Sequence, residues 1–259
     1  MPGKIVILGS GTSYGVPVIG CDCPVCRSTA PQDKRTRAAA WIVGEHGTSI
    51  ILDVGPDLRQ QCLRESINHL DGVLLTHTHA DHLHGIDDLR AFTLHDRKPL
   101  PLYASSEHCD FIRRHFEYIF QDDAGVFGWG IPRLDLKTVD NAPFELGEFI
   151  IHPVPLNHGQ WQCTGYRIGN LAYLTDCNGI PETSLGLLQN LDILVIDALR
   201  WKPHKTHNSI TESLAIVDEL KPALTVFTHL SHDICHEKDS AFLPQKCCFA
   251  YDGLTLSFS

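Results

Sequence analysis

Short runs of apolar residues recur along the chain, and most of them end at or beside a polar residue. The clearest runs lie at 4–9, 48–55, 72–77, 149–158, 170–176, 192–198, 224–229 and 254–258. Runs of this length that are rich in β-branched residues predict strands, and strands of continuous apolar sequence are usually covered on both faces. Between them, apolar residues spaced three and four positions apart predict helices over 57–65, 86–92, 107–120 and 211–220.

The predicted strands and helices alternate to the end of the chain, and no linker-like tract or internal repeat divides it. The sequence therefore predicts one domain over residues 1–259, of the α/β class. The least regular stretch, 121–141, is predicted to be an excursion over the surface. The arginine-rich stretch from Arg35 to Arg37 is predicted to be solvated surface.

Four predicted strands are each followed directly by a residue that can bind a metal ion. These residues are His77, His158, Asp176 and His229. Strand ends converge at one edge of a sheet, so side chains that are far apart in the sequence can meet there on rigid elements. We therefore expect a functional site at this edge.

The composition is that of an ordinary globular protein of 259 residues, with 43% hydrophobic and 20% charged residues. The formal net charge is −10. Nucleic-acid binding normally needs a basic stripe, so this balance argues against a nucleic-acid partner. It does not exclude a small anionic substrate, because bound metal ions can reverse the sign of the field inside a pocket.

Three features bear on the cellular compartment. The first eight residues lack the charged-then-apolar pattern of an export signal, and no apolar run approaches the roughly 18 residues of a membrane span. The ten cysteines do not indicate a secreted disulfide scaffold, since that interpretation suits short chains with a small core. We expect a reduced, cytoplasmic protein without a membrane partner.

The strongest chemical signal is the motif H-x-H-x-D-H directly after an apolar strand. Its members are His77, His79, Asp81 and His82. The alternative is a solvated, histidine-rich turn without a ligand. The two alternate histidines can hold one ion while the following Asp and His point to a second. Two neighbouring ions can share a hydroxide whose pKa is lowered toward neutrality.

A dinuclear site needs more ligands, and the other strand ends provide candidates. These are His158 in PLNHG, Asp176 in YLTDC and His229 in FTHLSH. Taken singly, each would more often be an ordinary loop residue or a helix cap. Their order and placement after the first motif favour metal binding, and a carboxylate such as Asp176 can bridge two ions.

A second cluster lies near the N-terminus, at residues 20–26. Cys21, Cys23 and Cys26 offer three thiolates within six residues, which is enough for three corners of a tetrahedral zinc site. The best candidate for the fourth ligand is His232, three residues beyond His229. The alternative is three thiols without a metal, but so dense a cysteine knot favours zinc in a reducing compartment.

H-x-H-x-D-H followed by a strand-end His, Asp and His resembles the metallo-β-lactamase superfamily, and the resemblance runs from Lys4 to Phe258. It implies a four-layer αββα sandwich with metals at one edge of its two central sheets. It also implies seven ligands for two ions: His77, His79 and His158 for the first, Asp81, His82 and His229 for the second, and Asp176 as the bridge.

GSGTSYGVPVIGCDCPVC, together with THLSH, resembles the phosphoribosyl cyclic phosphodiesterase family of the carbon–phosphorus lyase pathway. The resemblance implies that the Cys3His group is structural zinc. It implies that two divalent ions (Mn, Zn or Fe) hydrolyse a small cyclic phosphodiester such as phosphoribosyl 1,2-cyclic phosphate through a shared hydroxide. It also implies a catalytic role for His207, which on the residues alone is only a histidine at a helix start.

In this mechanism Asp81 would orient the hydroxide and accept its proton, and His207 would protonate the leaving oxygen. The partner would be a small phosphorylated molecule, and a homodimer is compatible with the sequence. The segment 116–132 departs from the phosphodiesterase family, which leaves the substrate open. Alternatives within the fold are a tRNA-processing endonuclease, a thioester hydrolase or oxygenase, and a non-catalytic relative of the pyrroloquinoline quinone biosynthesis protein B.

Overall fold

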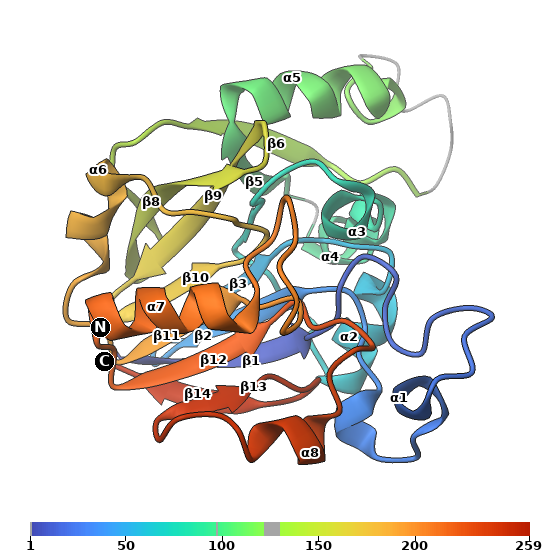
Figure 1. The fold of residues 1–259 in the computed structure, drawn as a ribbon. Helices are drawn as coiled ribbons and strands as arrows, with labels where there is room; N and C mark the ends of the chain where they lie inside the picture. Colours follow the sequence, from blue (N-terminus) through green and yellow to red (C-terminus); the bar gives the residue numbers. More distant parts are fainter. Residues whose placement is uncertain (1, 97, 122–129) are drawn as a thin grey trace.

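The computed structural model describes residues 2–96, 98–121 and 130–259 (Figure 1). Two mixed seven-stranded sheets form its centre. The first sheet has the spatial order β14 (Thr255–Phe258), β1 (Gly3–Gly9), β2 (Ala39–Gly44), β3 (Ser49–Leu52), β4 (Gly72–Leu74), β5 (Leu100–Ser105), β6 (Leu134–Val139). The second has the order β13 (Cys247–Phe249), β12 (Leu224–Thr228), β11 (Ile193–Asp197), β10 (Leu171–Leu174), β9 (Trp161–Ile168), β8 (Phe149–His158), β7 (Phe144–Leu146).

Helices cover the outer faces of both sheets (Figure 1). Those between the strands of the first half are α1 (Pro24–Arg27), α2 (Leu58–Arg64), α3 (Ala80–Leu83), α4 (Arg90–Asp96) and α5 (Ser106–His115). Those of the second half are α6 (Glu182–Leu185), α7 (Ile210–Leu220) and α8 (His236–Ser240). Short 3-10 turns lie at Pro31–Asp33, Ile86–Leu89, Glu117–Ile119 and Gly186–Leu188. No helix in the described part of the chain is both long and apolar enough to cross a membrane.

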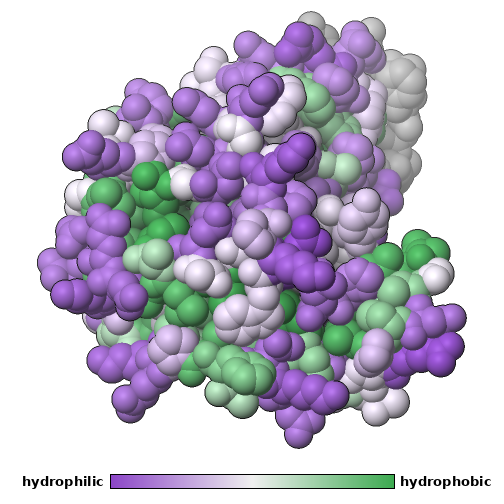
Figure 2. All heavy atoms as spheres, in the orientation of Figure 1, coloured by the Kyte–Doolittle hydropathy of each residue, from purple (hydrophilic) through white to green (hydrophobic). Residues whose placement is uncertain are grey.

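The apolar residues of each strand alternate between two core layers, and β1 illustrates this. Ile5 and Ile7 pack in the cluster between the two sheets, whereas Val6 and Leu8 pack on the outer face against α2. A strand buried on both faces has no polar alternation, which explains its continuous apolar sequence. Hydrophilic residues accordingly predominate on the face shown in Figure 2. The arrangement confirms the predicted four-layer αββα sandwich.

The prediction of a surface excursion over 121–141 is wrong for part of that stretch. Residues Leu134–Val139 form β6, which pairs in parallel with β5 at the edge of the first sheet. Leu134 and Leu136 pack on the outer core layer, while the alternate positions Asp135 and Lys137 are exposed. This short polar alternation is a weaker signal than a continuous apolar run. Residues 122–129 lie outside the described part of the chain.

The two sheets are joined at the end where the candidate ligands follow their strands. The Tyr166 hydroxyl donates a hydrogen bond to the Leu75 carbonyl at 2.8 Å, and the Thr164 amide donates to the Thr76 carbonyl at 2.9 Å. Both acceptors lie between β4 and His77. This link fixes the loop after β4 relative to the second sheet. The remaining candidate ligands lie at the ends of strands in that sheet.

Candidate metal centre

The structure brings the seven candidate ligands together at one edge of the two sheets. Their ligand atoms form two overlapping groups, and within each group all of them lie within 4.8 Å of one another. The first group is His77, His79, His158 and Asp176, and the second is Asp81, His82, Asp176 and His229. Asp176 belongs to both groups, which is the position that the resemblance gives to a bridging carboxylate.

The Asp176 carboxylate lies at the centre of this arrangement. Its Oδ1 is 3.2 Å from His82 Nε2 and 3.4 Å from His229 Nε2, and its Oδ2 is 3.7 Å from His77 Nε2. Asp81 provides a second carboxylate, whose Oδ2 lies 3.1 Å from His82 Nε2. Imidazole nitrogens and carboxylate oxygens thus face a common space from several different elements.

The donor atoms fit divalent cations. The Nε2 atoms of His77, His82 and His229 are buried and have no hydrogen-bond partner in the described part of the chain. An unsatisfied buried polar atom costs about 1–3 kcal/mol, so three of them gathered around the Asp176 carboxylate favour bound cations. A mixture of imidazole and carboxylate donors suits Zn, Mn or Fe.

A further layer of hydrogen bonds orients the histidine rings. His82 Nδ1 donates to the Asp53 carboxylate at 2.7 Å, and His158 Nδ1 donates to the Thr206 carbonyl at 2.9 Å. Each contact engages Nδ1 and leaves Nε2 for an ion, as is usual for ligating histidines. The Thr76 hydroxyl, 3.0 Å from His77 Nδ1, also bonds to Asp53. Asp53 was not among the site residues predicted from the sequence, although it too follows an apolar strand.

The two ligand groups differ in their electrostatics. Burial lowers the pKa of His77 and of His79, and lowers that of His158 to about 4, so these imidazoles are neutral and ready to bind. Burial also opposes protonation of His229, but Asp176 and other carboxylates outweigh it and raise its pKa to about 9. The pKa of His82 is raised well above its usual value in the same way, with Asp176 the largest opposing charge. An ion that binds at the second group would therefore displace protons.

His207 lies beside the metal ligands but is held by a different partner. Its Nδ1 is 2.8 Å from the Asp197 carboxylate, and its ring centroid lies 4.7 Å from that of His229 and 4.9 Å from that of His158. Asp197 is fully buried at the end of β11 and also accepts the Cys177 amide at 3.0 Å. Since Asp197 occupies Nδ1, only His207 Nε2 remains for another contact.

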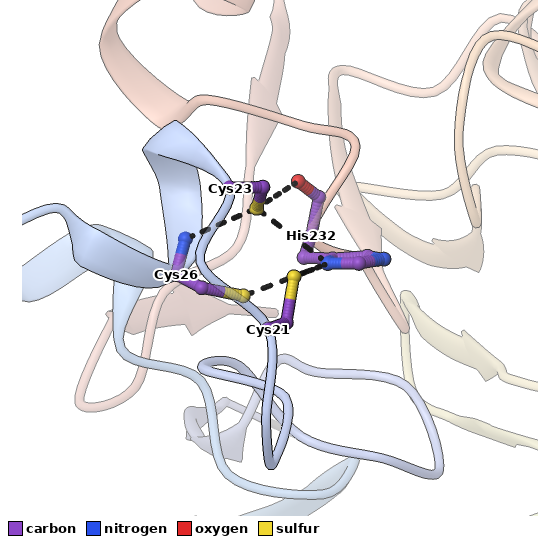
Figure 3. A group of neighbouring side chains, drawn as sticks. All are labelled: Cys21, Cys23, Cys26 and His232. Carbon is purple, nitrogen blue, oxygen red and sulfur yellow. Dashed lines mark hydrogen bonds between the residues drawn. The ribbon is translucent and has the colours of Figure 1, made fainter.

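The cysteine cluster forms a separate group with His232 (Figure 3). The Sγ atoms of Cys21, Cys23 and Cys26 lie 3.3, 3.6 and 3.5 Å from His232 Nδ1. A tetrahedral zinc with its usual bond lengths separates sulfur and nitrogen ligands by about 3.6 Å. The spacing therefore fits a zinc ion held by all four residues, as expected for a Cys3His site.

Comparison with known proteins identifies the family. Residues 48–230 match the model of the beta-lactamase superfamily domain, which is more than half of the chain. The chain belongs to this superfamily.

Several relatives align with nearly all of this chain. It is 41% identical to a diphosphatase from the PhnP family whose crystal structure superposes with a TM-score of 0.92, covering 100% of this chain and 98% of that one. It is 38% identical to an octanoyltransferase of Porphyromonas gingivalis over 97% of this chain, but it spans only 51% of that relative. It is 33% identical to the coenzyme PQQ synthesis protein B of Methylorubrum extorquens, covering 97% of this chain and 99% of that protein.

More distant structures share the fold. Zinc-bound PqqB from Methylobacterium extorquens has a TM-score of 0.79 at 21% identity, covering 98% of this chain and 99% of that one. The short form of human tRNase Z has a TM-score of 0.70 at 17% identity, with 99% of both chains covered. The fold is therefore common to relatives with different names.

The prediction that the arginine-rich stretch 35–37 is solvated surface is wrong for Arg35. Arg35 is 2% exposed rather than solvated. Its guanidinium donates to the Ser231 and Ile234 carbonyls at 2.9 and 2.8 Å, and pairs with Asp33 at 3.1 Å. These contacts hold the backbone on both sides of His232. An arginine stretch in sequence carries no sign of these two carbonyl acceptors, because they lie 196 and 199 residues away.

Proposed function

We propose that this protein is a metal-dependent phosphohydrolase that cleaves a small phosphoric diester. The observation that carries this proposal is the combination of two ligand groups sharing Asp176 with a separate Asp197–His207 pair beside them. The ligand groups serve to activate water and to bind phosphoryl oxygens, and the pair can supply a proton on the leaving side. A cyclic phosphodiester, such as phosphoribosyl 1,2-cyclic phosphate, is the first candidate substrate.

The residues divide the task between the two sides of the scissile bond. Two divalent ions at the ligand groups would supply Lewis acidity, polarising phosphoryl oxygens and acidifying a water molecule. Asp81 is placed to orient the attacking water and accept its proton. Its pKa is held well below the usual range because His82 and His229 outweigh the effect of burial, so it is ionised at neutral pH.

His207 acts on the leaving group. With Nδ1 bonded to Asp197, the ring is fixed with Nε2 as its only free nitrogen. A proton on Nε2 can pass to the leaving oxygen as the phosphorus–oxygen bond breaks, which is the task of a general acid.

A diphosphate is the second candidate substrate. It is favoured by the 41% identity to a PhnP-family diphosphatase over the whole chain. Hydrolysis of a diphosphate uses the same attack on phosphorus, with a phosphate oxygen in place of an alkoxide as the leaving group. The ligand set and His207 serve either reaction.

Three alternatives within the fold have less support. A tRNA-processing nuclease should carry a basic surface, whereas the net charge here is −10. A thioester hydrolase has no evident use for the Asp197–His207 pair, and the octanoyltransferase relative is about twice the length of this chain. A non-catalytic relative of PQQ synthesis protein B does not need the full set of seven ligands.

A panel of substrates tests the proposal. Purified protein loaded with Mn or Zn is incubated with bis(p-nitrophenyl) phosphate, ribose 1,2-cyclic phosphate, ADP-ribose, an octanoyl thioester and precursor tRNA. We expect release of phosphate-ester products from the small phosphodiesters or from the diphosphate, and none in Asp81→Ala. Cleavage of the thioester or the tRNA alone would refute the proposal.

A further inference from the structure

Two loops beside the metal centre are held together by one side chain, Asn178. Its Nδ2 donates to the Lys205 carbonyl at 2.9 Å, and its Oδ1 accepts the Gly159 amide at 2.9 Å. Its own backbone amide donates to the Asn157 carbonyl at 2.9 Å. The turn between β8 and β9 and the loop before His207 therefore form one continuous surface next to the ligand His158.

Trp161 lies on this surface. It is the Cα partner of His158 across the β8–β9 hairpin, and directly paired residues of antiparallel strands place their side chains on the same face. Trp161 is 65% exposed. A single exposed aromatic residue is ordinary on a protein surface. The position of this one is informative, because it neighbours a metal ligand on the side of the centre where His207 lies.

The second loop, which precedes His207, is basic. Residues 200–207 contain three cations and two histidines and no carboxylate, in a chain of net charge −10. The His204 ring is exposed and its centroid lies 5.2 Å from that of His207. Lys205 is exposed, and no carboxylate within the described residues forms an ion pair with it. Arg200, by contrast, pairs with Asp233 at 3.6 Å.

We propose that Trp161, His204 and Lys205 form a nucleotide subsite on the leaving-group side of the metal centre. The base stacks on Trp161, and Lys205 and His204 contact the nucleotide's single phosphate, which lies next to the scissile bond. The substrate is then a nucleoside monophosphate joined through a diphosphate bond to a second group. This inference rests on the proposed function and selects its second candidate, the diphosphate.

The chemistry of the subsite matches this class of molecule. An aromatic side chain stacks with the π-face of any base, whereas a ribose phosphate offers no such face. An ammonium group binds a phosphate as a point charge. In the reaction, the attacked phosphorus gains the oxygen of water. The bridging oxygen leaves with the nucleotide and takes the proton from His207, and the water's proton passes to Asp81.

Binding of the product tests the subsite without catalysis. The protein has four tryptophans, and we titrate their fluorescence with AMP and, separately, with ribose 5-phosphate. We expect saturable quenching by AMP that is lost in Trp161→Phe and retained in Phe242→Ala. Phe242 is the control, because it is another exposed aromatic residue (72%) that is not one of the three residues of the proposed subsite. Equal quenching in wild type and Trp161→Phe would overturn the proposal.

Kinetics provide the second test. In Trp161→Ala, kcat/KM for ADP-ribose should fall about 5- to 150-fold, which corresponds to the roughly 1–3 kcal/mol of one stacked base. The value for ribose 1,2-cyclic phosphate should stay within about twofold. Lys205→Ala should raise KM for ADP-ribose, and the matched surface variant Lys238→Ala should not.

The outcomes separate the two proposals. If wild type hydrolyses none of the phosphate substrates, the proposed function fails. If it hydrolyses only the cyclic ribose phosphate, or if Trp161→Ala affects both substrates equally, the phosphohydrolase function stands and the nucleotide subsite is wrong. A poorly folded Trp161→Ala is recognised by its thermal unfolding, and Trp161→Phe then decides through the AMP titration.

Discussion

Replacing His207 by alanine removes one proton donor without touching the proposed metal ligands. Its Nδ1 is engaged by Asp197 at 2.8 Å, and its side chain is 12% exposed, so the ring is both fixed and accessible. The substitution leaves the seven ligands and their orienting contacts with Asp53 and Thr206 in place. We therefore expect His207→Ala to retain its full metal content.

The expected loss depends on the leaving group. A positioned general acid contributes roughly 10²–10⁴ in rate, or about 2.7–5.4 kcal/mol of transition-state stabilisation. An ester with an alkoxide leaving group needs the proton and should lose turnover by this factor. A p-nitrophenyl ester has a leaving group that is stable as an anion, so its loss should be much smaller.

The assay compares kcat for a methyl phosphodiester and its p-nitrophenyl analogue in wild type and His207→Ala, with metal content measured by elemental analysis. Asp197→Asn is the companion variant. It keeps the ring but removes the carboxylate that accepts from His207 Nδ1, so turnover of the alkoxide ester should fall while the metal content stays unchanged. Equal losses on both esters would point to binding instead of proton donation, and unchanged turnover on both would remove His207 from the mechanism.

Four further predictions concern the two metal sites. Asp81→Ala should abolish phosphodiesterase activity and lower occupancy of the second ion; near-normal turnover with both ions bound would contradict the dinuclear assignment. Cys23→Ala should lose the chelation-resistant zinc and lower the unfolding temperature more than it changes kcat, because a structural zinc contributes to folding. Ion binding should release protons, detected by calorimetry in buffers of different ionisation enthalpy, because the pKa of His229 is raised to about 9. In the metal-free protein this raised pKa stabilises the fold fully below the ordinary 6.5 and is lost as the pH rises through about 9, so metal-free stability should fall across that window.

The sequence predicts the strands and the ligands for the same reason. Strands that are buried on both faces have continuous apolar sequences. A polar residue at the end of such a sequence is therefore easy to recognise. His158 and Asp176 were found in this way, and the structure places them in one ligand group. The edge strand β6 was missed because only one of its faces packs on the core.

The residues that orient the ligands are much harder to predict. Asp53 and Asp197 also follow apolar strands, but a strand-end carboxylate in sequence does not reveal whether it faces an ion or a histidine. Arg35 is harder still, because its acceptors are backbone carbonyls of the distant 231–234 segment. Backbone acceptors carry no residue identity, so no motif can encode such a contact.

The backbone conformation at the metal centre also could not be predicted from the conformational preferences of its residues. Asp53, Asp176 and His229 all have positive φ, at 65°, 52° and 59°, in a region that costs non-glycine residues about 1–2 kcal/mol each. Aspartate tolerates this conformation better than most residues, but histidine at 229 needs support. The next residue, Leu230, supplies it: its amide donates to the Ser10 carbonyl at 2.8 Å and its carbonyl accepts the Thr12 amide at 3.2 Å.

The turn after β12 is thus constrained from both ends. On one side β12 is fixed in the sheet, and on the other His232 lies in the Cys3His group, only three residues beyond His229. Relaxing φ at His229 toward an ordinary value would require the Leu230 bonds to break or the cysteine cluster to move. The strain is therefore maintained by contacts with the N-terminal segment, and these contacts keep His229 Nε2 beside Asp176. The N-terminal loop, which contains no catalytic ligand, is part of what makes the metal centre.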